Sequence, residues 1–160
     1  TLSGMSTRRF CFEAFLPSDK KEKQIILEEL KRETRTIIIY EAPHRLVRTL
    51  HELLEALGNR KITLLRELTK KHETVMQSTF EDLLGYYDDK EPKGECVIVI
   101  EGKSREEIVE EEKEQWREMS LEEHMEFYLS QGISKKEAMK AVAKDLGIPK
   151  REIYQQLIEE

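Results

Sequence analysis

Hydrophobic residues in the first hundred positions form short runs that are typical of strands. The run "FCFEAFL" (10–16) is aromatic and partly alternating, and it predicts a strand that ends at Pro17. "RTIIIYE" (35–41) is a continuous β-branched run, which predicts a central strand covered on both faces. Three further runs predict strands: "KITLLREL" (61–68), "ETVMQSTF" (73–80) and "ECVIVIE" (95–101).

Helical spacing separates these runs. Ser18 or Asp19 can cap a helix over about 19–32. Residues 44–57 place apolar side chains at intervals of three and four, and Gly58 ends that pattern. Residues 81–88 predict a short third helix. Strands interleaved with helices predict an α/β domain over residues 1–102.

The connections indicate how the strands pair. Connections that contain a helix favour parallel pairs, whereas the short loop between residues 68 and 73 favours an antiparallel pair. We therefore expect a mixed five-stranded sheet with flanking helices.

The composition changes after residue 102. The segment 103–118, "KSREEIVEEEKEQWRE", is acidic and poor in apolar residues, so it predicts an exposed linker that is helical in part. Residues 119–160 show three short helical patterns. Within them "SKKEAMKAVAKDLGIPKREIYQQL" (134–157) has helix-turn-helix spacing, with Gly147 at the turn and Pro149 as the first residue of the next helix. We expect a small helix-turn-helix-like domain.

The charged residues of this tail have two interpretations. The chain has 160 residues and a net charge of −6, which is unlike a uniformly basic nucleic-acid binder. Basic residues nevertheless gather in the tail, including Lys136, Lys140, Lys150 and Arg151. They predict either a face that contacts RNA phosphates or the solvated surface of a packing bundle.

Several classes of protein are disfavoured. Cys11 and Cys96 lie in strand-like runs and predict reduced core cysteines, and no Cys/His spacing resembles a zinc site. No apolar run approaches the roughly 20 residues that span a membrane. The opening "TLSGMSTRRF" lacks an initiator Met and is loop-like, so we expect a piece of a longer protein.

The stretch "YEAPHR" (40–45) follows a predicted strand directly. Ligands of open α/β sheets bind beyond the carboxyl ends of strands, and the next helix would offer its N-terminus to phosphate. Arg45 could then contact an anion. In the alternative interpretation Pro43 merely starts the helix and Glu41 pairs with Arg45 or a lysine.

Two further stretches also have two interpretations. "RELTKKHE" (66–73) is either a solvated hairpin or a polar floor that presents Arg66 and Lys70 to an anionic substrate. Gly94 either makes a turn or permits the close approach of a ligand. Because no nucleotide-binding or metalloprotease motif is present, the residues alone predict a ligand corner without a reaction.

Four stretches together resemble a known family: "SGMSTRRFCFEAFLP", "RTIIIYEAPHRLVRTL", "LLRELTKKHETVMQSTFEDLL" and "KGECVIVIEG". In order and spacing they are similar to the second half of the bacterial ribosomal RNA small subunit methyltransferase I family, which is tetrapyrrole methylase-like. The first domain of that family, with its Gly-rich cofactor loop, has no counterpart here. Met5 stands where the family often has Leu, and Ala14 where it often has Gly.

The resemblance implies a fold, a cofactor and a reaction. It implies two α/β domains with S-adenosylmethionine (SAM) in the cleft between them. It implies methyl transfer to the ribose 2′-hydroxyl of a cytidine in small-subunit (16S) rRNA by a cytoplasmic homodimer, without a metal for cofactor binding. Without its first domain, this chain alone is expected to be inactive.

The resemblance also implies site residues. The cofactor would contact mainly backbone at Tyr40, Glu41, Ala42, Leu68, Thr69 and Gly94. Substrate phosphates would meet Arg45, Arg66 and Lys70, and Glu67 is a candidate for the base that takes the hydroxyl proton. Two rival functions stay open: a non-enzymatic module for RNA binding and dimerisation, and a SAM methylase that acts on a small tetrapyrrole-type molecule.

Overall fold

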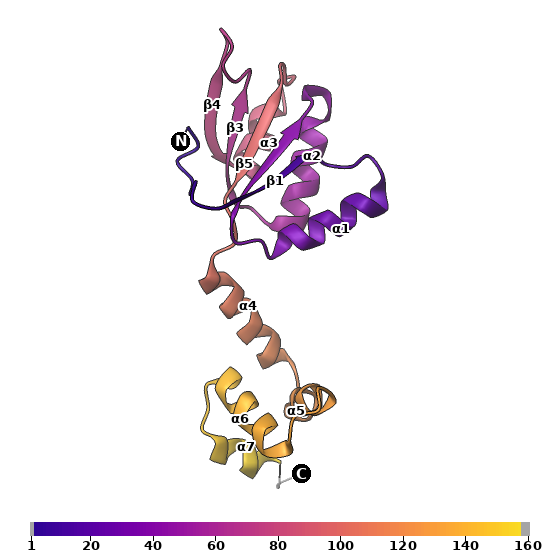
Figure 1. Cartoon of the computed structure of the whole chain (residues 1–160), viewed down its shortest axis with the longest axis vertical. Coiled ribbons are helices and arrows are strands. Elements are labelled where there is room, and N and C mark those ends of the chain that lie inside the picture. Colours follow the sequence, from indigo (N-terminus) through magenta and orange to yellow (C-terminus); the bar gives the residue numbers. More distant parts are fainter. Residues whose placement is uncertain (1, 158–160) are drawn as a thin grey trace. The chain divides into compact units, whose positions relative to one another are not determined.

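A computed structural model describes residues 2–157 of the chain (Figure 1). The chain divides into two compact units, one up to Ser104 and one from Arg105. Residue 1 of the predicted α/β domain and residues 158–160 of the predicted helical domain lie outside the described residues.

The first unit contains a five-stranded sheet in the order β1-β2-β5-β3-β4. The strands are β1 (Phe10–Phe15), β2 (Thr36–Glu41), β3 (Lys61–Arg66), β4 (Thr74–Thr79) and β5 (Cys96–Ile100). β1 and β2 are parallel and every other pair is antiparallel, which confirms the predicted mixed sheet. The helical connection from β2 to β3 predicted a second parallel pair, and this was wrong, because β5 lies between them and bonds to both.

The helices of this unit are α1 (Lys20–Lys31), α2 (Pro43–Leu57) and α3 (Phe80–Tyr87), close to the predicted ranges. Asp19 caps α1, since its side chain accepts the N–H groups of Lys21 and Glu22. Pro43 opens α2, where its missing N–H costs no helical hydrogen bond.

The core lies between the sheet and these three helices, which cover one of its faces (Figure 1). Ile37 and Ile39 of β2 are fully buried there, as are Leu46 and Leu50 of α2. Burying one such side chain contributes about 1.5–3 kcal/mol. Cys11 and Cys96 are free and buried, as predicted, and burial raises the pKa of Cys11 to about 12 and that of Cys96 to about 11.

The opposite face of the sheet is largely open. Exposed apolar side chains on it include Phe10, Phe12, Tyr40 and Val75. The expectation that β2 is covered on both faces was therefore wrong: β2 is central, but Tyr40 is 40% exposed. A continuous apolar run shows that a strand is interior to a sheet, but it does not show what covers each face.

The N-terminal segment, residues 2–7, crosses part of this open face. Thr63 donates its hydroxyl to the carbonyl of Ser3, and Thr36 donates to that of Ser6. In β1 the register shifts between Phe12 and Ala14, and Ala14 has φ +51. The position where the resembled family often has Gly is therefore one where the backbone favours Gly.

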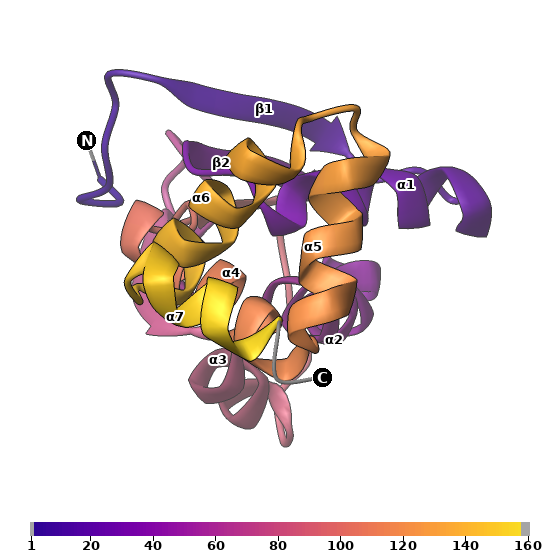
Figure 2. The ribbon, with the colours of Figure 1, turned by 90° about the horizontal axis from the view of Figure 1, so that it is seen from below.

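The second unit consists of α4 (Arg105–Glu118), α5 (Leu121–Ser130), α6 (Lys135–Leu146) and α7 (Lys150–Gln156). The segment expected as a linker, 103–118, is thus mostly α4. α6 packs against the three other helices, and Figure 2 views this group from its end. The buried side chains of this core are Met125, Ala138, Met139, Val142, Ala143 and Ile153.

The turn between α6 and α7 follows the prediction except at one position. Gly147 ends α6 in the left-handed conformation with φ +68. Pro149 was predicted as the first helical residue, but it is the N-cap residue of α7, with extended ψ 139.

Candidate functional site

The predicted cofactor residues from three separate stretches converge at one edge of the sheet. β2 and β3 both end there, and β5 begins there, because β5 runs antiparallel to both. Glu41 and Arg66 each stand opposite Cys96 in the register. We call this region, residues 40–45, 66–70 and 94–95, the ligand edge.

The carboxylate of Glu41 points into the protein. Glu41 is 2% exposed and accepts hydrogen bonds from the N–H of Ala42 at 2.8 Å and the hydroxyl of Thr49 at 2.6 Å. Arg45 places its Nε 3.4 Å from the same carboxylate and donates from Nη2 to the carbonyl of Leu16. The structure thus shows the alternative interpretation, in which Glu41 pairs with Arg45. The guanidinium of Arg45 contacts Glu41 and Leu16, which are groups of the protein itself.

Glu67 joins the two loops of the ligand edge. Its Oε1 accepts the N–H of Glu95 at 2.8 Å and lies 3.3 Å from the Nζ of Lys70. The hydrogen bond from the N–H of Glu95 is the largest cause that lowers the pKa of Glu67 below its usual value, and Lys70 lowers this pKa further. A carboxylate held in its charged form accepts a proton poorly at neutral pH.

Lys70 and Thr69 are also engaged by neighbouring carboxylates. The Nζ of Lys70 lies 2.9 Å from Oε2 of Glu95, and this hydrogen bond is the largest cause that raises the pKa of Lys70. The N–H of Thr69 donates to Oε2 of Glu73 at 2.7 Å. Lys70 therefore bridges two carboxylates rather than presenting an unpaired charge to an anion.

Gly94 adopts φ +80, which side chains rarely tolerate. A Cβ on residue 94 would lie 2.5–2.8 Å from side-chain atoms of Glu67. The group that lies close to Gly94 is thus the side chain of Glu67, which belongs to the protein itself.

An apolar hollow of about 360 Å³ opens on the uncovered face of the sheet beside the ligand edge. Tyr40 and Leu68, two predicted cofactor contacts, lie in its wall with Leu65 and Val97. Ser3 and Ser6 of the N-terminal segment border it. An apolar wall with a few polar groups at its rim suits a flat organic ring.

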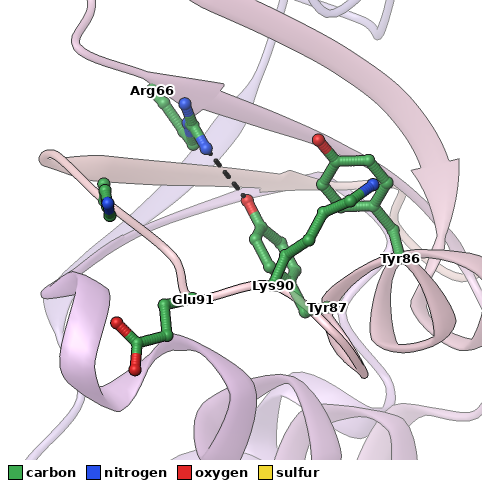
Figure 3. A pocket seen from close by; sticks show the side chains of 6 residues that line it. Arg66, Tyr86, Tyr87, Lys90 and Glu91 are labelled. Carbon is green, nitrogen blue, oxygen red and sulfur yellow. Dashed lines mark hydrogen bonds between the residues drawn. The ribbon is translucent and has the colours of Figure 1, made fainter.

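A second hollow, of about 460 Å³, lies beside α3 and is lined by Arg66, Tyr86, Tyr87, Lys90, Glu91 and Lys93 (Figure 3). Arg66 donates to the hydroxyl of Tyr87 at 3.5 Å, and burial raises the pKa of Tyr87. Of its residues, only Arg66 was predicted as a site residue. The stretch "YYDDKEPK" (86–93) carries aromatic and basic residues, but residues 86 and 87 lie in α3 while 90–93 lie in a loop, so no periodic pattern marked them.

The predicted basic residues of the tail lie on the surface of the second unit. Lys136, Lys140, Lys150 and Arg151 are exposed. Lys136 and Lys140 are one helical turn apart on α6, and Nζ of Lys150 donates to the carbonyl of Lys136 at 3.3 Å. The fold therefore brings Lys150 to Lys136 at the start of α6, with Lys140 one turn further along the same helix.

Two absences apply to the described part of the chain. Within residues 2–157 no three His, Cys, Asp or Glu side chains are grouped so as to hold a metal ion. Over the same residues no helix combines the length and the apolar character needed to cross a membrane.

Known proteins resemble the chain strongly in sequence. It is 45% identical over 152 residues to the ribosomal RNA small subunit methyltransferase I of Bacillus subtilis, covering 95% of this chain and 52% of that protein. The protein of the same name from Halalkalibacterium halodurans is 43% identical over the same shares. The chain thus spans about half the length of these curated relatives. No family model matches it.

Solved structures resemble the chain more weakly. The X-ray structure of a cobalt precorrin-4 methyltransferase aligns with a TM-score of 0.43 and 17% identity, covering 58% of this chain and 40% of the other. A likeness at this level adds nothing to what the sheet itself shows, so the relationship rests on sequence. Over 95% of its length, the chain is a homologue of the proteins named ribosomal RNA small subunit methyltransferase I.

Proposed function

We propose that this chain is part of a SAM-dependent methyltransferase that modifies small-subunit rRNA at the ribose 2′-hydroxyl of a cytidine. The observation that carries the proposal is the 45% identity over 95% of the chain to a relative of that name. Because the chain spans about half of such relatives, the activity requires the other half as well, and this chain alone is inactive. The working protein is a cytoplasmic homodimer.

The ligand edge is this chain's share of the cofactor site. Tyr40 and Leu68 offer the apolar wall of a hollow of about 360 Å³, which fits the adenine of SAM. The N–H groups of Ala42 and Thr69 already donate to Glu41 and Glu73, so they do not serve as free donors. Glu41 and Gly94 shape the backbone around the ring.

When bound, SAM supplies a methyl group already activated on a sulfonium, so the residues of this chain contribute mainly by positioning. Glu67 is a poor base, because its carboxylate accepts the N–H of Glu95 and its pKa is lowered. We assign Glu67 to holding the loops of the ligand edge together.

The RNA is held by phosphate contacts. The exposed group Lys136, Lys140, Lys150 and Arg151 supports such a role for the second unit. In the first unit Arg66 is the better candidate, because Arg45 and Lys70 are engaged by carboxylates.

The test is a calorimetric titration of SAM into this chain and into a longer version. The longer version adds the half of the relatives that this chain does not cover. We expect binding by the longer version alone, together with transfer of labelled methyl to small ribosomal subunits. If neither version binds SAM, the methyltransferase proposal is overturned. Methyl transfer to a small tetrapyrrole, but not to RNA, would mean that the substrate is a tetrapyrrole and not rRNA.

One observation favours a second candidate, a non-enzymatic RNA-binding module. The second unit has its own buried core and carries the exposed basic group. This candidate predicts RNA binding that survives removal of residues 1–104, with no SAM binding by any version.

A further inference from the structure

The hollow beside Arg66 collects positive charge that the protein leaves without a carboxylate partner. Within residues 2–157 neither Arg66, Lys90 nor Lys93 forms an ion pair. Lys90 instead places its Nζ over the ring of Tyr86, 3.7 Å from the ring centre. This arrangement differs from that of Lys70, whose charge is balanced by two glutamates.

The guanidinium of Arg66 is incompletely satisfied. Its contact with the hydroxyl of Tyr87, at 3.5 Å, is at the long limit for a hydrogen bond, and its buried Nε has no acceptor. Arginine donors have the geometry that phosphate oxygens accept. Figure 3 shows Arg66 and Tyr87 pointing toward one another, while the carboxylate of Glu91 points away from Arg66.

The hollow is also next to the ligand edge along the chain. Arg66 directly precedes Glu67, and Lys93 directly precedes Gly94. Arg66 points to the face of the sheet that carries α3, since it contacts Tyr87, whereas its neighbour Leu65 lines the apolar hollow on the other face. Tyr86, which is 41% exposed, adds an aromatic surface of the kind that sites for single-stranded nucleic acids combine with cations.

We propose that this hollow binds one phosphate group of the RNA backbone, with Arg66 at its inner wall and Lys90 and Lys93 at its mouth. The inference rests on the proposed function and deepens it. A volume of about 460 Å³ holds a phosphodiester together with part of its nucleoside. The subsite lies at the end of β3 on the side of α3, while the basic group on α6 and α7 supplies separate contacts.

The experiment measures binding of a fluorescent hairpin from the small-subunit decoding region to this chain, by anisotropy at several salt concentrations. The variants are Lys90→Gln and Lys93→Gln, both at exposed positions. The matched control is Lys61→Gln, an exposed lysine at the opposite end of β3 from Arg66. Circular dichroism checks that each variant is folded.

We expect Lys90→Gln and Lys93→Gln each to weaken binding by about threefold to tenfold, and to lower the salt slope by about one. Lys61→Gln should bind like the unchanged protein. Equal affinities and slopes for all three variants, or no binding by the unchanged chain at low salt, would overturn the inference.

A second readout separates this inference from the proposed function. In the longer version, methyl transfer to small subunits is measured with each variant at varied RNA concentration. A raised KM for RNA with unchanged SAM affinity supports the subsite. If the variants of the longer version transfer methyl with unchanged kinetics, the subsite is rejected and the proposed methyltransferase function is kept. Weakened RNA binding in a protein that transfers no methyl keeps the subsite and rejects the function.

Discussion

The side chain of Glu67 fills the space above Gly94, so that a Cβ at residue 94 would lie 2.5 Å from the Cγ of Glu67. Gly94→Ala should therefore lower the free energy of unfolding by about 1–3 kcal/mol, because it adds this clash to a φ of +80. Urea denaturation measures the change. Gly85→Ala is the control: it lies in α3 with open space around it, and it should be neutral or stabilising.

A double mutant separates the clash from the backbone strain. In a Glu67→Ala background, Gly94→Ala should cost less than in the unchanged protein, because only the positive φ remains. Strictly additive changes in unfolding free energy would show that Glu67 does not occupy this space.

Removing the buried carboxylate of Glu41 should destabilise the first unit. Glu41→Ala leaves the hydroxyl of Thr49 without its acceptor and the guanidinium of Arg45 without its ion-pair partner, at a cost of about 3–5 kcal/mol. Urea unfolding followed by circular dichroism measures this loss. Glu55→Ala, at an exposed position of the same helix as Thr49, should change stability by less than about 0.5 kcal/mol. Similar losses in both variants would contradict the assignment.

Glu33 should make stability depend on acid. Hydrogen bonds from the Arg35 side chain, at 2.6 and 2.9 Å, lower the pKa of Glu33 from 4.5 to about 2. Because the folded pKa is below the unfolded one, the stabilisation is complete above about pH 4.5 and is lost as the pH falls toward 2. Melting temperatures of Glu33→Gln should fall less between pH 5 and pH 2 than those of the unchanged protein.

Glu28→Gln is the control for this acid effect. Its side chain is 59% exposed and pairs with Lys31 only at 4.0 Å. Its melting temperatures should keep the acid dependence of the unchanged protein. The assignment to Glu33 would be rejected if the two variants lost stability in parallel.

Ala14→Gly should stabilise the first unit. Ala14 has φ +51 at the irregularity in β1, a conformation that costs a residue with a Cβ about 1 kcal/mol and costs Gly little. We expect a higher urea midpoint. Ala56→Gly, within α2, should instead lower the midpoint, because it lowers the free energy of unfolding by about 1 kcal/mol. A lower midpoint for both variants would refute the strain at residue 14.

Tyr128→Phe should weaken the second unit. The hydroxyl of Tyr128 donates to Oδ2 of Asp145, which also lies 3.2 Å from Nε2 of the buried His124. Losing a hydrogen bond to a carboxylate costs about 1.5–3 kcal/mol. Fluorescence of Trp116, the single tryptophan, reports unfolding because its ring stacks on His124 with centres 4.2 Å apart.

Tyr154→Phe is the control for this change. Tyr154 is 57% exposed on α7, and its loss of a hydroxyl should leave the unfolding midpoint unchanged. Equal shifts for the two tyrosines would mean that the contact with Asp145 does not stabilise the unit.

The sequence by itself determined the elements of the fold and the place of the ligand edge. Apolar spacing located the strands and helices, and caps such as Asp19 and Gly147 located helix ends, because these signals act over a few neighbouring residues. The resemblance assigned cofactor contacts to three stretches, and their convergence follows once β5 pairs with both β2 and β3.

Only the tertiary structure decided what the charged side chains do. Whether Glu41 faces Arg45 or a ligand, whether Glu67 can act as a base, and whether Lys70 carries an unpaired charge all depend on partners in other elements or loops, such as Thr49 of α2 and Glu95 before β5. The hollow beside Arg66 likewise exists only because α3 and the loop before β5 meet the end of β3. Local patterns set where an element forms, but the charge and space around a side chain are set by groups far away in the sequence.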